Sequence, residues 1–535
     1  MTTTIIINRR DFNGSPVCLN GRSIPLPIGT NFEASDELLV LLANAKVRYT
    51  IVTAQGDTTG KIIIPVDGPY GGRLPLTING KTYFLAIGEP FTPLTGVTEA
   101  LANAKVPFVY ERTAAVSTWM AAATRGEVAT STGSTGANPR FICRTRHYLG
   151  KGTYSALRFV YGNYFVGTSN SETGSVAAAT LFVGVEIPGA PIPVVELKWS
   201  GAGTVNMAGG APWVESDVIL PSQFGLTAFA PGTEIWLRPA RDNITGDIRV
   251  FNGTVGSVPG EAAYTCPTSG AGTDQHMGTG PLTLPTGGGA NTNLYMPLLI
   301  KGLSASHGKT EFFLGNSLAY GQGEGLLGAN DGEFEGGMLR KAAFALGLPW
   351  SSVARPATSV STYIMSDSGV PRNAKRALLY PYFSDFYDDY GTNDLGNTNT
   401  STGSARTATQ ILADRMTMYD QILAANPSAK IHPIKMTPRV SAGSYANVPA
   451  SQVPVGGYAT ADVGGRTDVN NGLVAAIGTH GIVSVVDTST NVMADATLTD
   501  RIAQIGGSPG SVDGLHATSA MYLLMKEPVR LDMAA

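Results

Sequence analysis

The first residues whose spacing suggests chemistry surround a serine past the middle of the chain. The apolar stretch FFL runs into GNSLAYG, which places Ser317 in a turn flanked by Gly315 and Gly321. A tight turn of this kind, between a strand and a helix, exposes a serine hydroxyl and leaves backbone N–H groups for an oxyanion. Ser317 is therefore a candidate nucleophile. Gly-x-Ser also arises by chance in a chain rich in glycine and serine, so this motif alone favours an ordinary turn.

A second candidate lies in the segment YGTNDLG at residues 390–396. Asn393, on a turn just past an expected buried strand, can donate its side-chain amide to a developing negative charge. Asp394 can cap the segment that follows. Taken alone, an Asx turn that merely closes the loop explains both residues better.

The third candidate is the segment DGLHAT at residues 513–518. A carboxylate three residues before a histidine can accept the imidazole Nδ1 proton and leave Nε2 free as a base. Of the six histidines, only His516 has an acidic residue, Asp513, at this spacing. A surface histidine beside an aspartate with no catalytic role is the alternative.

The residues after 295 supply the elements that must position these motifs. Strands are predicted at residues 310–314, 383–389, 430–436 and 481–486, and helices at 336–346, 407–425 and 469–478. Alternation of this kind implies a mainly parallel sheet covered on both faces, with its ligand site at the carboxyl ends of the strands. We therefore predict an α/β domain over residues 295–535.

The middle of the chain, residues 119–294, has a different sequence pattern, with short strand-like runs in place of alternating strands and helices. A short helix and then a Ser/Thr/Gly linker are expected over residues 118–138. Strand-like runs between Gly, Pro and Asn follow, at residues 155–161, 178–187, 193–199, 233–241 and 248–251. This pattern predicts a β-sandwich that ends in a Gly/Thr-rich loop at residues 265–293.

The N-terminal part contains an internal repeat. Residues 28–49 align without a gap on residues 87–108, and both copies contain ANAKV. Each copy reads as a loop, a short amphipathic helix and a strand, the first strand at residues 48–53. We expect two small tandem α+β modules, at about 1–60 and 61–118, that serve attachment. A duplicated fold with no specific partner is the alternative.

Composition excludes several classes of protein. Charged residues form only 14% of the 535 residues, against about 25% in average soluble domains. The net charge is -3 and no basic run occurs, so we expect no nucleic-acid partner. No run is long and apolar enough for a membrane span, and the N-terminus does not resemble a signal peptide. Three distant cysteines, Cys18, Cys143 and Cys266, are expected to be buried thiols in a reducing compartment.

The three motifs, in this order and in one α/β domain, resemble the SGNH/GDSL hydrolase family over residues 295–535. GNSLAYG matches the family's Gly-Asp-Ser block, with Ser317 as the nucleophile and Asn316 where the family usually has Asp. Residues 391–394 match the Gly-x-Asn-Asp block, so Asn393 resembles its oxyanion donor. Asp513 and His516 match the final Asp-x-x-His block.

The resemblance implies acyl transfer to water by a Ser317–His516–Asp513 triad, without a metal or other cofactor. It also implies an oxyanion hole formed by Ser317, Asn393 and a glycine of the family's second block. For that glycine we choose Gly369, in SDSGVP, after an expected strand at residues 360–365. A plain turn glycine explains Gly369 equally well.

The whole arrangement resembles a bacteriophage virion protein, with an anchor, a spacer and an esterase that removes O-acetyl groups from bacterial surface polysaccharide. That likeness implies assembly in the host cytoplasm, action at the host cell surface, contacts with other virion proteins through the repeats, and a homo-oligomer such as a trimer. Trp199, Trp213 and Trp236 are candidate sugar platforms, with burial in the core as the alternative. A non-catalytic virion or receptor-binding protein is the main competing function, and a bacterial lipase or thioesterase is a third.

Overall fold

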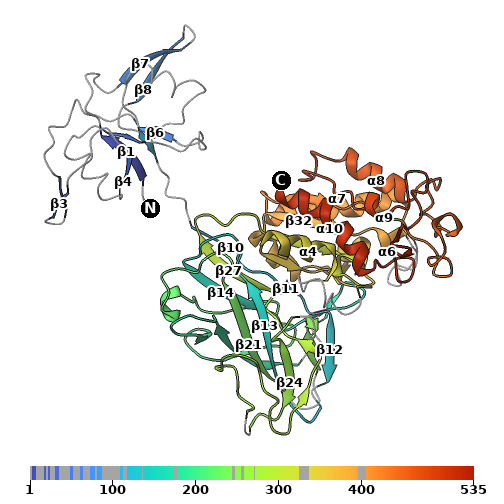
Figure 1. Cartoon of the computed structure of the whole chain (residues 1–535), viewed down its shortest axis with the longest axis horizontal. Coiled ribbons are helices and arrows are strands. Elements are labelled where there is room, and N and C mark those ends of the chain that lie inside the picture. Colours follow the sequence, from blue (N-terminus) through green and yellow to red (C-terminus); the bar gives the residue numbers. More distant parts are fainter. Residues whose placement is uncertain are drawn as a thin grey trace. The chain divides into compact units, whose positions relative to one another are not determined.

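The chain divides into two compact units, Met1–Val116 and Ser117–Ala535 (Figure 1). The structure is a computed structural model. It describes the backbone of strands β1 to β9 before residue 117, and residues 117–535 except 135, 174–176, 244–247, 255–257, 270–271, 325–335 and 396–404. The two units are described separately below.

In the first unit the described strands form antiparallel pairs. A sheet has the order β4-β1-β5, and the other pairs are β2-β3, β6-β9 and β7-β8. Their bounds are β1 Thr3–Ile7, β2 Val17–Leu19, β3 Arg22–Ile24, β4 Asn31–Ala34, β5 Tyr49–Ile51, β6 Lys61–Ile63, β7 Arg73–Ile78, β8 Lys81–Ala86 and β9 Val109–Glu111. β5 lies within the strand predicted at residues 48–53, whereas the predicted helices of the repeat and the Cys18 side chain lie outside the described residues.

In the second unit two antiparallel sheets pack face to face. One has the order β18-β17-β21-β13-β24-β25 with β19 paired to β17, and the other has the order β10-β27-β14-β20. Alternate residues of these strands meet in one apolar core, for example Phe141 and Cys143 from β13 and Leu157 and Phe159 from β14. The bounds are β10 Thr118–Ala121, β13 Arg140–Tyr148, β14 Ala156–Tyr161, β17 Ala179–Glu186, β18 Val194–Glu196, β19 Val205–Met207, β20 Val214–Glu215, β21 Glu234–Asn243, β24 Ala262–Cys266, β25 Gly289–Ala290 and β27 Leu299–Ser304.

The second unit also contains short two-stranded pairs and 3-10 turns. The pairs are β12 Ser131–Ser134 with β22 Ile248–Phe251, β15 Phe165–Val166 with β16 Glu172–Thr173, β23 Gly253–Thr254 with β26 Asn293–Leu294, β30 Ser366–Asp367 with β31 Val370–Pro371, and β34 Gln504–Ile505 with β35 Ser508–Pro509. The 3-10 turns are η1 Pro221–Phe224, η2 Arg376–Tyr382 and η3 Pro449–Ser451.

The helix predicted within residues 118–138 is wrong. This segment contains the strands β10, β11 (Gly126–Glu127) and β12 instead. The run from Trp119 to Ala123 has helix-forming residues, but β10 pairs along its length with β27, which is far away in sequence. Pairing with a distant strand has overridden the local preference.

A five-stranded parallel sheet carries the C-terminal part, in the order β11-β29-β28-β32-β33. The strands are β28 Glu311–Gly315, β29 Trp350–Ser352, β32 Asp385–Asp389 and β33 Lys430–Pro433. The helices are α3 Ser317–Tyr320, α4 Gly337–Leu346, α5 Val360–Tyr363, α6 Thr392–Leu395, α7 Ala408–Ala425, α8 Arg466–Ala475, α9 Ser489–Val492 and α10 Ser519–Ala534. Figure 1 shows α4, α7 and α10 gathered around β32.

Both faces of this sheet are covered. Phe312 and Leu314 of β28 point into a core shared with α5 and α7, whereas Phe313 between them points into a core shared with α4 and α10. Alternation along a strand sends successive side chains to opposite faces, so the apolar run FFL is buried on both. The carboxyl end of β28 is thereby fixed between two helical layers.

Two predicted strands of this part differ in the structure. Residues 360–365 contain α5, because Ser359 and Asp394 both accept N–H groups at its first turn. Residues 481–486 make only isolated parallel bridges to β33 and the residue after it, through Ile482 and Val486. The expected boundary at residue 294 is also crossed in both directions, since β11 joins the parallel sheet and β27 joins the sandwich.

The predicted sugar platforms and thiols can be located in the second unit. Trp199 and Trp236 are buried, and Trp213 is half-buried and stacks on Tyr382. Cys143 and Cys266 are buried thiols. No helix of the described residues has the length and apolar character needed to cross a bilayer.

Candidate active site

The turn after β28 presents Ser317 as the first residue of α3. Asn316 caps this helix, since its Oδ1 accepts the Leu318 N–H at 3.0 Å while its Nδ2 donates to the Asp389 carbonyl at 3.2 Å. An ionised aspartate here could accept but not donate a hydrogen bond, so Asn316 adds a hydrogen bond to the neighbouring strand β32. Gly315 is needed at φ +148, because a Cβ there would lie 2.6 Å from that of Ala319.

The structure brings Ser317, His516 and Asp513 into one hydrogen-bonded line. His516 Nε2 lies 2.9 Å from Ser317 Oγ, and His516 Nδ1 lies 2.6 Å from Asp513 Oδ2. With the Nδ1 proton donated to the carboxylate, Nε2 accepts the hydroxyl proton. This is the geometry that a serine nucleophile and its general base require.

The loop before α10 holds Asp513 and His516 in place. Asp513 Oδ1 accepts the backbone N–H groups of Leu515 and His516 at 3.0 and 2.8 Å. Partial burial acts to raise the pKa of Asp513, but these N–H groups and the imidazole outweigh it and lower that pKa. Asp513 is therefore ionised where it contacts the ring. Gly323 packs against the other side, and a Cβ there would come 2.7 Å from that of His516.

Asn393 and Asp394 connect the turn after β32 to the loop after β29. Asn393 is buried and its Nδ2 donates to the Thr358 carbonyl at 2.8 Å. Asp394 accepts the N–H groups of Val360 and Ser361, both at 3.0 Å, so it caps α5 rather than the segment that follows it. The Asn393 amide is thus held beside the loop that borders the nucleophile.

Gly369 lies in the turn between β30 and β31, is exposed, and has no contact with the triad or with Asn393 among the described interactions. The loop that does reach the nucleophile turn is at residues 354–358. There, Ala357 has φ +63, and the Ala357 and Thr358 N–H groups donate to no acceptor among the described residues. A positive φ is usually signalled in a sequence by glycine. Here the residue is Ala357, so the sequence gives no sign of this loop.

Asp389, the last residue of β32, lies beneath the nucleophile turn. Its side chain accepts the Ala319 N–H and is buried. Burial and the adjacent Asp388 raise the pKa of Asp389 to about 8, against the opposing effects of Arg415 and the Ala319 N–H. The carboxyl group is therefore protonated at neutral pH.

The raised pKa of Asp389 predicts a pH-dependent stability. An unfolded aspartate ionises near pH 3.9, so the stability contributed by the neutral buried form is complete below about pH 4 and is lost as the pH rises to about 8. Asp389→Asn, which keeps a neutral side chain, should flatten this loss. Melting temperatures from pH 5 to 8.5, with the exposed Asp495→Asn as control, measure it. Parallel curves for wild type and Asp389→Asn would contradict the assignment.

A second Ser–His–Asp cluster lies at the amino end of the sheet. His432 contacts Asp385 through Nε2 at 3.1 Å, and its Nδ1 lies 2.7 Å from Asp532 and 2.8 Å from Ser484. Burial acts to lower the pKa of His432, but the two carboxylates outweigh it and raise that pKa. An imidazolium held between two carboxylates is a poor base, so we interpret this cluster as structural.

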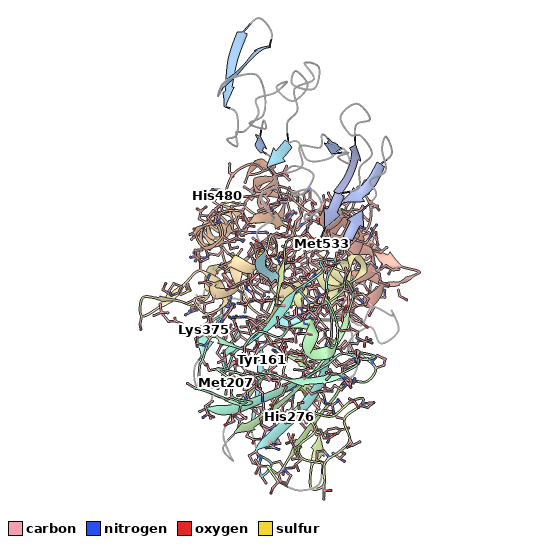
Figure 2. All side chains as sticks on the ribbon, turned by 90° about the vertical axis from the view of Figure 1, so that its left-hand side faces the viewer. Tyr161, Met207, His276, Lys375, His480 and Met533 are labelled. Carbon is pink, nitrogen blue, oxygen red and sulfur yellow. The ribbon has the colours of Figure 1, made fainter. Side chains whose placement is uncertain are left out.

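The remaining described histidines lie in other surroundings. His147 is buried in the sandwich, and His307 Nε2 lies 2.6 Å from the Thr118 carbonyl oxygen. His276 pairs with Asp274 and Glu196, and His480 pairs with Asp420. Figure 2 shows His276 among the strands and His480 among the helices. Across the described part of the chain, no group of three or more His, Cys, Asp or Glu residues is arranged to hold a metal ion.

Comparisons with known proteins give similarities to solved structures. No protein-family model matches the chain, and no curated protein matches it. A family two carbohydrate esterase from Clostridium thermocellum, solved with cellohexaose, is 14% identical, with 75% of this chain and 98% of that one covered and a TM-score of 0.29. A protein from Parabacteroides merdae described as a GDSL-like lipase is 14% identical over 42% of this chain and 95% of that one, with a TM-score of 0.29. A salicylyl acyltransferase from a tetracycline biosynthetic pathway is 13% identical over 79% and 98%, with a TM-score of 0.29. Carbohydrate esterases and a GDSL-like lipase are thus among the solved structures that this chain is similar to.

Proposed function

We propose that this chain is a serine esterase of the SGNH/GDSL type that removes O-acetyl groups from carbohydrate. The observation that carries the proposal is the line from the Ser317 hydroxyl through the His516 imidazole to the Asp513 carboxylate, with contacts of 2.9 and 2.6 Å. This line lies just past the carboxyl end of β28, which is where parallel sheets place their ligand sites.

The reaction proceeds in two halves through an acyl enzyme. His516 Nε2 takes the Ser317 proton as Oγ bonds to the ester carbonyl carbon, and then returns that proton to the alcohol as the ester C–O bond breaks. Water repeats the sequence: His516 takes its proton, the hydroxide attacks, and Ser317 is reprotonated as acetate leaves. Asp513 stabilises the imidazolium in both halves.

The tetrahedral oxyanion needs donors on the far side of the reacting carbon. The Ser317 backbone N–H and the Asn393 amide remain our candidates. In place of Gly369 we assign the backbone N–H groups of Ala357 and Thr358, because their loop contacts both Gly315 and Asn393. Donors fixed before the reaction stabilise the developing charge without reorganisation.

The low exposure of the nucleophile and its base favours a short acyl group. Ser317 is only 4% exposed, and the side chain of His516 is 13% exposed. An acetyl group needs little room beyond the carbonyl, whereas a long acyl chain needs an apolar channel. This supports an acetyl esterase over a lipase. The saccharide as alcohol, and a place in a bacteriophage virion, rest on the repeat, the low charge and the Gly/Thr-rich texture of the sequence.

The proposal is tested with the full chain and a set of acetylated saccharides. We expect acetate release, rates that fall from acetyl to butyryl to octanoyl aryl esters, and attachment of a fluorophosphonate probe to the peptide that contains Ser317. A preference for long chains would favour a lipase instead. Absence of any hydrolysis and of any labelling would leave a non-catalytic binding scaffold.

Replacement of the oxyanion donor is expected to act on turnover. Asn393→Ala should lower kcat by about a hundred- to a thousandfold, the effect of losing one such donor, with a small change in KM. Steady-state kinetics on an aryl acetate measure this. Asn426→Ala is the matched control, because Asn426 also donates to buried carbonyls, those of Tyr380 and Phe383. An equal fall of kcat in both variants would show that Asn393 acts only through folding.

A further inference from the structure

Arg355 belongs to the loop that borders the nucleophile. Its backbone N–H donates to the Gly315 carbonyl at 3.1 Å, and its own carbonyl accepts the Thr358 hydroxyl at 2.6 Å. Ala357 and Thr358, which carry the assigned oxyanion donors, follow it in the loop after Pro356. The backbone of Arg355 is therefore fixed beside the turn that carries Ser317.

The side chain of Arg355 is half-buried without a carboxylate partner. Its Nε donates to the Val166 carbonyl at 2.7 Å. Burial lowers the pKa of Arg355, with the Tyr320 phenol opposing that shift. Three fully buried cations of this part are paired with an acid: Arg376 with Glu172, Arg415 with Asp388 and Lys341 with Glu324. Buried Arg466 instead donates to the Thr499 carbonyl. A partly desolvated charge costs free energy unless a counter-charge meets it.

The acids around the site are engaged elsewhere. Asp513 binds His516, and Asp394 caps α5. Glu324 accepts the Gly337 N–H and pairs with Lys341. Asp389 is neutral because its pKa is raised to about 8. The protein itself therefore provides no anion for Arg355 among its described residues.

The outer nitrogens of Arg355 are available to a ligand. Nη1 and Nη2 donate to no acceptor among the described residues, and neither is among the buried polar atoms that lack a partner, so both are open to solvent. Two parallel N–H donors of a guanidinium match the two oxygens of a carboxylate. The fixed Nε bond to Val166 orients this pair in advance.

We propose that Arg355 binds a carboxylate carried by the saccharide, so that the substrates are acetyl esters of acidic sugars. The inference rests on the proposed esterase function and names its substrate class. Because an acetyl group has no second charge, the carboxylate belongs to the alcohol part of the ester. Arg355 acts here on specificity, while the triad performs the chemistry.

The test compares two esters that differ only in charge, 4-acetoxybenzoate and its methyl ester. In Arg355→Gln the ratio of kcat/KM for the charged over the uncharged ester should fall by about ten- to a hundredfold, the effect of one charge-assisted hydrogen-bonded pair. Arg355→Lys should give a ratio between those of Arg355→Gln and wild type, because lysine keeps the positive charge but lacks the two parallel N–H donors of the guanidinium. Acetylated galacturonate against acetylated galactose repeats the comparison on sugars.

Arg530→Gln, on the exposed face of α10, controls for the change of net charge and should leave the ratio unchanged. If Arg355→Gln lowers kcat/KM equally for both esters, or leaves the ratio as in wild type, the assignment of Arg355 is overturned while the esterase stands. If wild type hydrolyses neither ester in a Ser317-dependent way, the proposed function itself fails.

Discussion

Replacing Ser317 by alanine is expected to lower kcat for acetyl ester hydrolysis by about four to six orders of magnitude. The hydroxyl lies 2.9 Å from His516 Nε2, and no neighbouring side chain of this line can form the acyl enzyme in its place. The oxyanion donors remain in the variant, so a small rate above the background of water should persist. Stopped assays at high enzyme concentration measure this residual activity.

Two further variants make the prediction specific to the triad. Ser351→Ala removes another buried hydroxyl, which bonds the Leu298 carbonyl at 2.9 Å, and should leave kcat within about threefold. His516→Ala should lose nearly as much as Ser317→Ala, and the double variant no more than either, because the residues act as a unit. A Ser317→Ala enzyme with wild-type kcat, or losses that add in the double variant, would contradict the mechanism.

Arg415→Leu is expected to destabilise the second unit by about 3–5 kcal/mol, because it leaves the buried carboxylate of Asp388 without its partner. Arg415 on α7 bonds Asp388 Oδ2 at 2.7 Å and the carbonyls of Tyr390 and Asp388 at 3.0 Å, and both charged side chains are fully buried. All five tryptophans lie after residue 117, so tryptophan fluorescence during denaturant unfolding reports on this unit alone.

The double variant Arg415→Leu/Asp388→Leu separates charge from packing. Removing both partners should recover part of the lost free energy of unfolding, since apolar pairs often replace buried ion pairs at little cost. Arg530→Leu breaks an exposed pair with Glu527 and should cost no more than about 1 kcal/mol. A loss in Arg415→Leu as small as that of Arg530→Leu would show that the Asp388 charge is compensated by other groups.

The sequence predicted those helices and strands whose ends are set by residues within or next to them. α7 follows the predicted helix at residues 407–425 closely, because Thr407 caps it and Gln410 completes the capping box. The strands β28, β32 and β33 begin within the predicted segments, and all their residues except Lys430 are buried. The Ser317, Asn393 and Asp513–His516 motifs are also predicted from the sequence. The structure places His516 and Asp513 in line with Ser317, and it places Asn393 beside Thr358, whose hydroxyl donates to the Gly315 carbonyl.

What the sequence did not show depends on contacts between distant segments. Residues 360–365 have β-branched residues that favour a strand, but Asp394 of the distant helix α6 accepts the first N–H groups of this segment, which forms the helix α5. Gly369 was chosen by spacing, whereas the loop that contacts Gly315 contains alanine at a positive φ. Arg355 stands out only through the absence of an acidic partner, which no local pattern can reveal.

The exchange of strands between the sandwich and the parallel sheet affects how such a molecule can evolve. β11 extends the parallel sheet from within the middle of the chain, β27 closes the sandwich from beyond residue 294, and Val166 holds the side chain of Arg355. Recombination that joined residues 295–535 to an unrelated N-terminal segment would remove β11 from the sheet. The hydrogen-bonding edge of β29 would then be exposed. The two halves are therefore expected to be inherited together, and their lineages to share one history.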